Sequence, residues 1–141
     1  MARIADLSTH PLTHWTGPFG LPDFPSIADE DFEPVFDAAL AAHEKEIVAI
    51  AGNGEAPTID NTLAALELAG DPLSRVSAVF WTLTEADTNE TIQALERKIA
   101  PRMSRHFSSI YMNADLFARI DALYRKRETL GLDAETMRVL D

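Results

Sequence analysis

The residues best suited to chemistry lie in the pentapeptide His43-Glu44-Lys45-Glu46-Ile47, which begins like the zinc-binding motif H-E-x-x-H. In that motif, two histidines one helical turn apart bind the metal and the glutamate activates a water molecule. Here Ile47 occupies the position of the second histidine, so the motif is incomplete. His43 also falls on an apolar helical stripe, where a packed and hydrogen-bonded histidine is the ordinary outcome. We therefore assign it no metal-binding role.

A second histidine pair, His10 and His14, has the same spacing of four residues. Pro11 lies between them, and the irregular surroundings disrupt the helical geometry that would direct both imidazoles at one metal ion. The chain has no cysteine, which excludes a disulfide framework and cysteine-ligated zinc or iron–sulfur sites. It also has no G-x-S-x-G, P-loop or G-x-G-x-x-G sequence. We predict no catalytic residue and no metal ligand in this chain, and its substrate-binding residues stay unknown.

The charge of the chain is unevenly distributed. Residues 1–70 carry 12 acidic and 2 basic side chains, whereas residues 71–141 carry 11 and 10, giving net charges of −10 and −1 that sum to −11. An acidic half of this kind repels phosphate backbones, which argues against a nucleic-acid partner.

A basic band follows one predicted helix and continues in a later tripeptide: Arg97, Lys98, Arg102, Arg105, His106 and Arg125-Lys126-Arg127. These residues could pair with acidic groups of the same chain or bind a carboxylate of a partner. The first arrangement is the commoner one, and exposed pairs contribute little stability. Glu30, Asp31 and Glu33 are too closely clustered at a helix start to suggest a two-carboxylate active site.

An irregular segment precedes the helices. Residues 15–27 combine three prolines and two glycines with an indole, two phenyl rings and two aliphatic side chains. Proline and glycine exclude a regular helix or central strand here. Each large apolar side chain would gain roughly 1.5–3 kcal/mol from burial. We therefore expect residues 1–28 to form an arm pressed onto the outside of a helical domain, residues 29–141, rather than a disordered leader.

The apolar residues of that domain recur at helical spacing. The first stripe follows a predicted N-cap at Asp29 and ends at Gly52-Asn53-Gly54; its members are Phe32, Phe36, Leu40, His43, Ile47 and Ile50. Further stripes begin near Thr58, Asp87, Asn113 and Asp133. Nothing is typical of a β-strand, so the sequence predicts an all-α fold.

Two prolines and the chain end modify these helices. Gly70-Asp71-Pro72 interrupts the second stripe, and Pro101 lies inside the third and should bend it. The last stripe stops at Asp141 after about two turns, too short to be stable without packing, so we expect a domain truncated at its C-terminus. We expect five side chains to be only partly covered within one chain, or covered by self-association: Leu116, Phe117, Leu123, Met137 and Leu140.

The sequence also bears on location. Residues 1–7 have no apolar core of signal-peptide length, and no later run approaches the length of a membrane span. We therefore expect a cytoplasmic protein without a membrane partner.

A set of short segments follows a recognisable order: the W-T-G-P-F-G-L-P-x-F arm, the helix from Phe32 to Ile50, residues 57–62 leading into 63–67, residues 75–80, Leu83-Thr84, Ala86, Thr88-Asn89, Ala100-Pro101 and Ile110-Tyr111. From about residue 11 to the end, this set resembles the N-terminal region of the thimet-oligopeptidase family of zinc metallopeptidases. It is most similar to the bacterial peptidyl-dipeptidase and oligopeptidase A members.

This resemblance implies a two-lobed, almost wholly helical enzyme with a deep channel that admits short peptides and excludes folded proteins. In that family, the zinc ion, the H-E-x-x-H helix and a further glutamate ligand belong to a later part of the full-length chain. The present chain would then be an inactive N-terminal fragment that contributes channel wall and scaffold. Its partners would be peptide substrates of the parent and the C-terminal catalytic region of the same polypeptide. The alternative is a free-standing acidic helical module for protein interaction.

Overall fold

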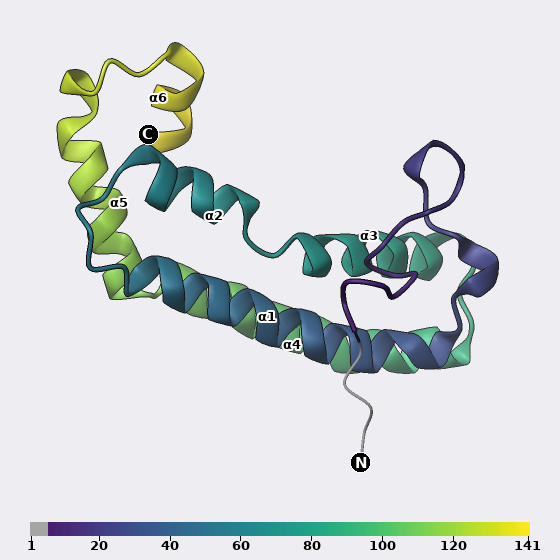
Figure 1. Ribbon diagram of the computed structural model, residues 1–141. Helices are drawn as coiled ribbons and strands as arrows, with labels where there is room; N and C mark the ends of the chain where they lie inside the picture. Colours follow the sequence, from purple (N-terminus) through teal and green to yellow (C-terminus); the bar gives the residue numbers. More distant parts are fainter. Residues whose placement is uncertain (1–5) are drawn as a thin grey trace. The chain divides into compact units, whose positions relative to one another are not determined.

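The computed structural model describes residues 6–141, and within them it contains helices and no β-strand. The predicted all-α fold class is therefore confirmed. The α-helices are α1 (Phe32–Ala51), α2 (Ala65–Leu68), α3 (Asp71–Ala86), α4 (Glu90–Tyr111), α5 (Ala114–Lys126) and α6 (Ala134–Leu140), as labelled in Figure 1. None of the helices in the described part is long and apolar enough to cross a membrane.

Two of the residues near which the sequence predicts a helix to begin are N-caps. The side chain of Asn113 accepts a hydrogen bond from the backbone N–H of Leu116 at 3.0 Å and so caps α5. Asp133 caps α6 in the same way by accepting from Thr136 at 2.7 Å. In both cases an oxygen of a short side chain accepts a hydrogen bond from a backbone N–H that has no acceptor within the first helical turn.

Two other helix starts differ from the prediction in detail. Asp29 is not an N-cap, because it begins a 3-10 turn, Asp29–Asp31, from which α1 continues. Within this turn the Asp31 carboxylate accepts from the backbone N–H of Ala28 at 2.9 Å. The start of α4 is capped by Asn89 rather than Asp87. The sequence places several polar residues next to each other at both starts, and backbone geometry decides which one caps.

The chain divides into two compact units, each with its own core. Unit 1 contains the chain up to Glu44 together with Gly70–His106, and unit 2 contains Lys45–Ala69 and Phe107–Asp141. Both α1 and α4 contribute residues to each unit.

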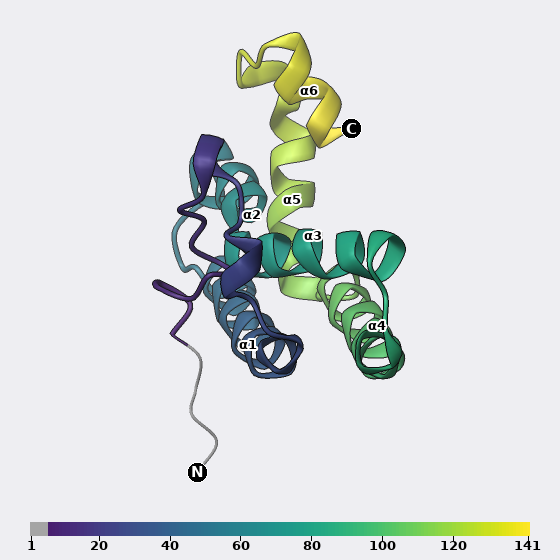
Figure 2. The ribbon, with the colours of Figure 1, turned by 90° about the vertical axis from the view of Figure 1, so that its right-hand side faces the viewer.

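Unit 1 is built from α3 and the N-terminal parts of α1 and α4. Figure 2 shows these parts of α1 and α4 nearly end-on, with α3 packed against them. The centre is an aromatic cluster in which the Phe80 ring lies 5.1 Å from Phe32 and 5.4 Å from Phe36, both in edge-on geometry. All three rings are fully buried. Edge-on pairs add to the large gain from burying a phenyl ring.

The arm contributes to this core only in part. Residues 1–5 lie outside the described residues; residues 6–28 contain turns and two 3-10 segments, Pro18–Gly20 and Phe24–Ser26. Leu12 is completely buried in the core, and Trp15 packs against it. Phe19 is instead fully exposed. The expectation that the large side chains of the arm are buried is therefore wrong for part of the segment.

The core of unit 2 forms where the end of α1 meets α5. Ile47 and Ile50 pack with Leu116 in one buried cluster. Leu123 and Leu140 are also buried, so the expectation that these leucines are incompletely covered in a single chain is wrong. Phe117, in contrast, has 65% of its surface exposed. The difference arises because contacts between separate segments of the unit cover one side of α5.

Candidate functional site

The histidine of the incomplete zinc motif is buried in unit 1 and pairs with a half-buried histidine. His43 Nδ1 lies 2.9 Å from His106 Nε2, so one ring donates a proton that the other accepts. His43 is only 7% exposed. A Cβ atom at Gly70 would lie 2.9 Å from His43 Cγ, which means that only glycine fits against this face of the ring. His43 is therefore a packing residue, as its place on the apolar stripe indicates.

The environment of the pair favours a neutral imidazole at His106. Burial lowers the pKa of His106 below its ordinary value of 6.5, because the charged form loses its hydration, and the nearby Glu44 carboxylate opposes this effect. Residues 6–141 hold no group of three or more histidine, cysteine, aspartate or glutamate side chains placed to hold a metal ion.

Polar contacts continue along α1 and α4 on the outside of unit 1. Lys98 lies 3.3 Å from Glu33, and Arg102 pairs with Asp37. From the first pair to the second, the residue number rises by four on both helices, so these parts of the two helices run parallel. Two members of the basic band therefore pair with acidic residues of the same chain, as expected. The contacts are exposed and each contributes little stability.

Two open depressions accompany this polar row in unit 1. The first has a volume of about 330 Å³ and is lined by Asp37, Leu40, Ala41, Glu44, Arg102, Arg105 and His106. The second has a volume of about 420 Å³, and its lining includes Glu33 and Lys98. The most reactive lining groups already contact each other or His43. Neither depression assembles a nucleophile with a base and an orienting group.

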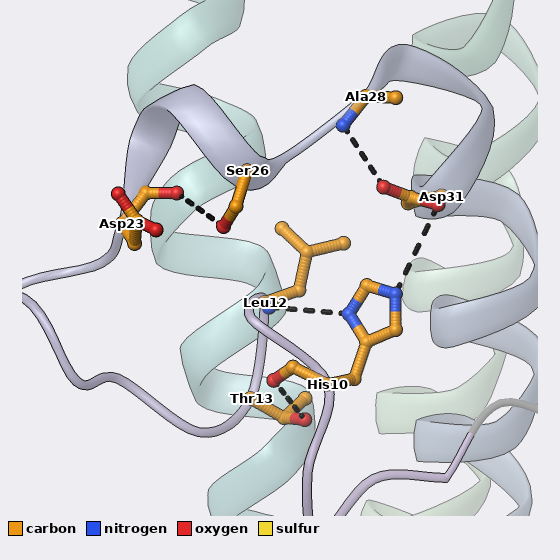
Figure 3. A network of polar contacts seen from close by, with 7 residues as sticks. All are labelled: His10, Leu12, Thr13, Asp23, Ser26, Ala28 and Asp31. Atoms are coloured by element: carbon orange, nitrogen blue, oxygen red, sulfur yellow. Dashed lines mark hydrogen bonds and ion pairs between the residues drawn. The ribbon is translucent and has the colours of Figure 1, made fainter.

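His10 has a structural role in the arm (Figure 3). Its Nδ1 accepts a hydrogen bond from the backbone N–H of Leu12 at 3.2 Å, and its Nε2 lies 3.9 Å from the Asp31 carboxylate. His14 is exposed, and its backbone N–H donates to the His10 carbonyl oxygen at 2.7 Å. The turn around Pro11 uses His10 to hold the arm against the start of α1.

Unit 2 contains a buried guanidinium group that the sequence analysis did not single out. Arg119, 7% exposed, donates to the carbonyl oxygens of Asn53 at 2.6 Å and Glu55 at 3.0 Å. Its other terminal nitrogen donates to Asn61 Oδ1 at 2.9 Å and Thr62 Oγ1 at 3.1 Å. Four acceptors thus compensate for burying the charge.

The Arg119 contacts hold an irregular stretch of backbone in unit 2. After the end of α1 the chain forms a loop and then a π-helical turn, Ile59–Ala64, before α2. Thr58 and Asn61 cap this turn reciprocally, at 2.8 and 3.0 Å. The sequence contains one indication that Arg119 is buried. Arg119 lies three residues after Leu116 and four before Leu123, and so falls on the apolar stripe of α5. A charge on a buried stripe requires partners.

Comparison with known proteins shows what this helical chain is similar to. No protein-family model matches it. Curated relatives nevertheless confirm the sequence resemblance, since the chain is similar to two proteins named dipeptidyl carboxypeptidase. It is 39% identical to the dipeptidyl carboxypeptidase of Escherichia coli (strain K12) over 130 residues, which are 92% of this chain and 19% of the relative.

A second relative gives the same result. The dipeptidyl carboxypeptidase of Salmonella typhimurium (strain LT2) is 40% identical over 136 residues, which are 96% of this chain and 20% of the relative. The chain thus spans about a fifth of the length of the curated relatives that it matches.

Proposed function

We propose that this chain is the N-terminal helical region of a zinc-dependent peptidase that removes dipeptides from the C-terminal end of short peptides. The observation that supports this proposal is the identity of 39–40% to two dipeptidyl carboxypeptidases over nearly the whole chain. Identity at this level along a continuous helical segment supports a shared parent architecture.

Within the parent, this region serves as scaffold and channel wall, and the catalytic and zinc-binding residues lie elsewhere in the polypeptide. Two features support this division of roles. The most buried polar groups, His43 and Arg119, hold other parts of the chain in place. The described residues also lack a group of three side chains suited to a metal ion.

The experiment uses the complete gene product and a matched pair of short peptides that differ only in the C-terminal group. One peptide has a free carboxylate and the other a terminal amide. We expect release of the C-terminal dipeptide from the free acid, its loss on treatment with a chelator and its return with zinc. Mass spectrometry identifies the products. Cleavage at internal bonds of both peptides would point to an oligopeptidase, and no cleavage of either would contradict the proposal.

We also propose that the parent acts in the cytoplasm and does not bind nucleic acid. The net charge of −11 supports the second point, since it repels a phosphate backbone. A shift of labelled DNA or RNA by the purified protein at physiological salt would contradict it.

A further inference from the structure

The most exposed aromatic side chain of the described residues occupies an unfavourable backbone conformation. Phe19 has φ 61° and ψ 20°, and it is the only non-glycine residue in the described part with a positive φ. Left-handed backbone is costly for a residue with a Cβ atom. The ring is nevertheless 100% exposed, so contacts with the rest of the described chain do not offset this cost.

Backbone hydrogen bonds between nearby residues close the loop that carries this ring. Gly17 donates to the Leu21 carbonyl at 2.9 Å, and Gly20 donates to the Gly17 carbonyl at 3.1 Å. A Cβ atom at Gly17 would lie 2.5 Å from the Leu21 oxygen, so glycine is required for this closure. We call residues 17–24 the aromatic loop.

The chain on both sides of the aromatic loop is anchored to unit 1. The indole nitrogen of Trp15 donates to the Leu12 carbonyl oxygen at 3.1 Å. The Arg75 guanidinium lies 5.3 Å from the centre of the Trp15 ring. On the other side, Ile27 packs against the core. Figure 3 shows the neighbouring contacts, including that between Ser26 and the Asp23 carbonyl. The loop therefore projects from a fixed base, which reduces the entropy that a contact must overcome.

We propose that the aromatic loop is a docking element, and that Phe19 inserts into an apolar pocket on the part of the parent polypeptide outside these 141 residues. Leu21 and Phe24, which are 55% and 44% exposed, extend the apolar surface of the loop. Aromatic side chains that fill a pocket on a partner are typical anchors of an interface.

The choice of partner rests on the proposed function, in which this chain is one region of a longer peptidase. The curated relatives are about five times as long as the segment they share with this chain, so under the proposed function a large surface of the same polypeptide lies outside the structure. An intramolecular partner is present at high effective concentration, which lets a small contact persist. A strained and exposed aromatic residue gains most from a partner of this kind.

The direct test places the photo-crosslinking residue p-benzoylphenylalanine at position 19 of the complete gene product. The same residue at position 82, an exposed site on α3, serves as the control. We expect position 19 to crosslink within one polypeptide to residues beyond 141, mapped by mass spectrometry, at a yield well above that of the control. Crosslinks to residues 6–141, to a second copy or to a bound peptide, or a yield equal to the control, would overturn the proposal.

A stability measurement on the complete protein provides a second test, because the two outcomes differ in sign. Phe19→Gly and Phe19→Asn both remove the ring and tolerate the left-handed backbone. If the ring is docked, both variants lower Tm, because the pocket loses its anchor. If the ring stays in water, relief of the strain leaves Tm unchanged or raises it. The second result overturns the proposal, and Phe19→Tyr, which keeps the ring, controls for the substitution itself.

The docking proposal and the proposed function can fail separately. A complete protein that crosslinks as expected but releases no dipeptide would contradict the peptidase assignment and retain the docking. An active peptidase whose position 19 gives no crosslink beyond residue 141 would contradict the docking alone. A gene product that ends at residue 141 would contradict both.

Discussion

Two buried polar side chains, His43 and Arg119, each join segments of the chain that are far apart in sequence. His43 contacts His106, 63 residues away, within unit 1. Arg119 contacts Asn53, 66 residues away, within unit 2. A buried polar group without a partner costs about 1–3 kcal/mol. At the residue scale, a few buried polar groups determine which chain segments pack together, and the same unit supplies the partners named here for each of them.

Removing the Arg119 side chain should destabilise unit 2. Arg119→Ala removes a donor from four oxygen acceptors, one of which belongs to the fully buried Thr62. We expect a loss of about 3 kcal/mol in the free energy of unfolding, measured by urea denaturation. Arg119→Lys keeps the charge but has only three donors, so it should lose less. Arg125→Ala is the control: its side chain is exposed, and we expect a change below about 0.5 kcal/mol.

The histidine pair should make stability depend on pH. Burial lowers the pKa of His106, so the unfolded chain binds this proton at a higher pH than the folded chain does. Protons therefore favour unfolding, and the effect sets in as the pH falls below 6.5 toward the lower pKa of the folded state. For one group the unfolding constant changes by at most about tenfold per pH unit.

The measurement is the urea midpoint between pH 8 and pH 5.5, where most carboxylates stay charged. Because lower pH also reduces the repulsion within an acidic chain, the comparison is with His106→Gln, which keeps a polar side chain but does not titrate. The wild-type chain should lose stability relative to this variant on acidification. Parallel curves for the two proteins would contradict the role assigned to the histidine pair.

At the scale of the helices, the sequence predicted local structure well. The first apolar stripe, Phe32 to Ile50, corresponds to α1, Phe32–Ala51. Pro101 lies inside α4, as predicted. Periodicity and caps depend on residues three or four apart, which the sequence displays directly. The predicted limits of the arm, residues 1–28, and of the helical domain, residues 29–141, stay predictions.

Contacts between helices were predictable only in part. The pairing of Lys98 and Arg102 with acidic residues followed from the charge distribution. The pairing of His43 with His106 did not, because no local pattern shows which faces of α1 and α4 meet. The buried state of Leu116 was missed for the same reason, since its partners lie on α1. Phe19 was missed because burial was inferred from its apolar character alone.

The glycine before α3 provides a test of packing between elements. Gly70 has φ 78° and contacts the His43 ring, whereas Gly131 has φ 63° and nothing within 4 Å of the position of a Cβ. Gly131→Ala should cost about 1 kcal/mol, from left-handed strain alone. Gly70→Ala adds a steric clash and should cost at least about 2 kcal/mol.

A double-mutant cycle separates these two effects. In a His43→Ala background the clash at position 70 is absent, so Gly70→Ala should cost no more than Gly131→Ala. Urea denaturation of the four proteins gives the coupling. An equal cost of Gly70→Ala in both backgrounds would show that the His43 ring does not restrict this position.

At the scale of the whole molecule, exposed apolar side chains are distributed unevenly. Of the large hydrophobic residues that are exposed in the described part, three belong to unit 1: Phe19, Leu21 and Phe24. The other nine belong to unit 2: Val48, Leu68, Phe107, Tyr111, Met112, Phe117, Tyr124, Leu130 and Val139. Contiguous apolar surface is typical of a region that contacts another protein surface, so self-association of the chain tests whether these side chains lie together.

This surface and the net charge should oppose each other in solution. A charge of −11 keeps copies of the 141-residue chain apart at low ionic strength, whereas burial of exposed apolar groups favours association. The Debye length falls from about 30 Å at 0.01 M salt to about 8 Å at 0.15 M. We therefore expect sedimentation equilibrium to give the monomer mass of 15.5 kDa at low salt and a larger mass at 0.5 M salt, where the approximate Debye length is below 8 Å. Two variants test which surface is responsible. Phe117→Ser should reduce the association, because it removes a large exposed ring of α5 without disturbing the buried Leu116. Val48 is also exposed but lies on α1, so Val48→Ser shows whether the association depends on α5 in particular. A chain that stays monomeric at both salt concentrations would show that the exposed side chains of unit 2 are too dispersed to form an interface by themselves.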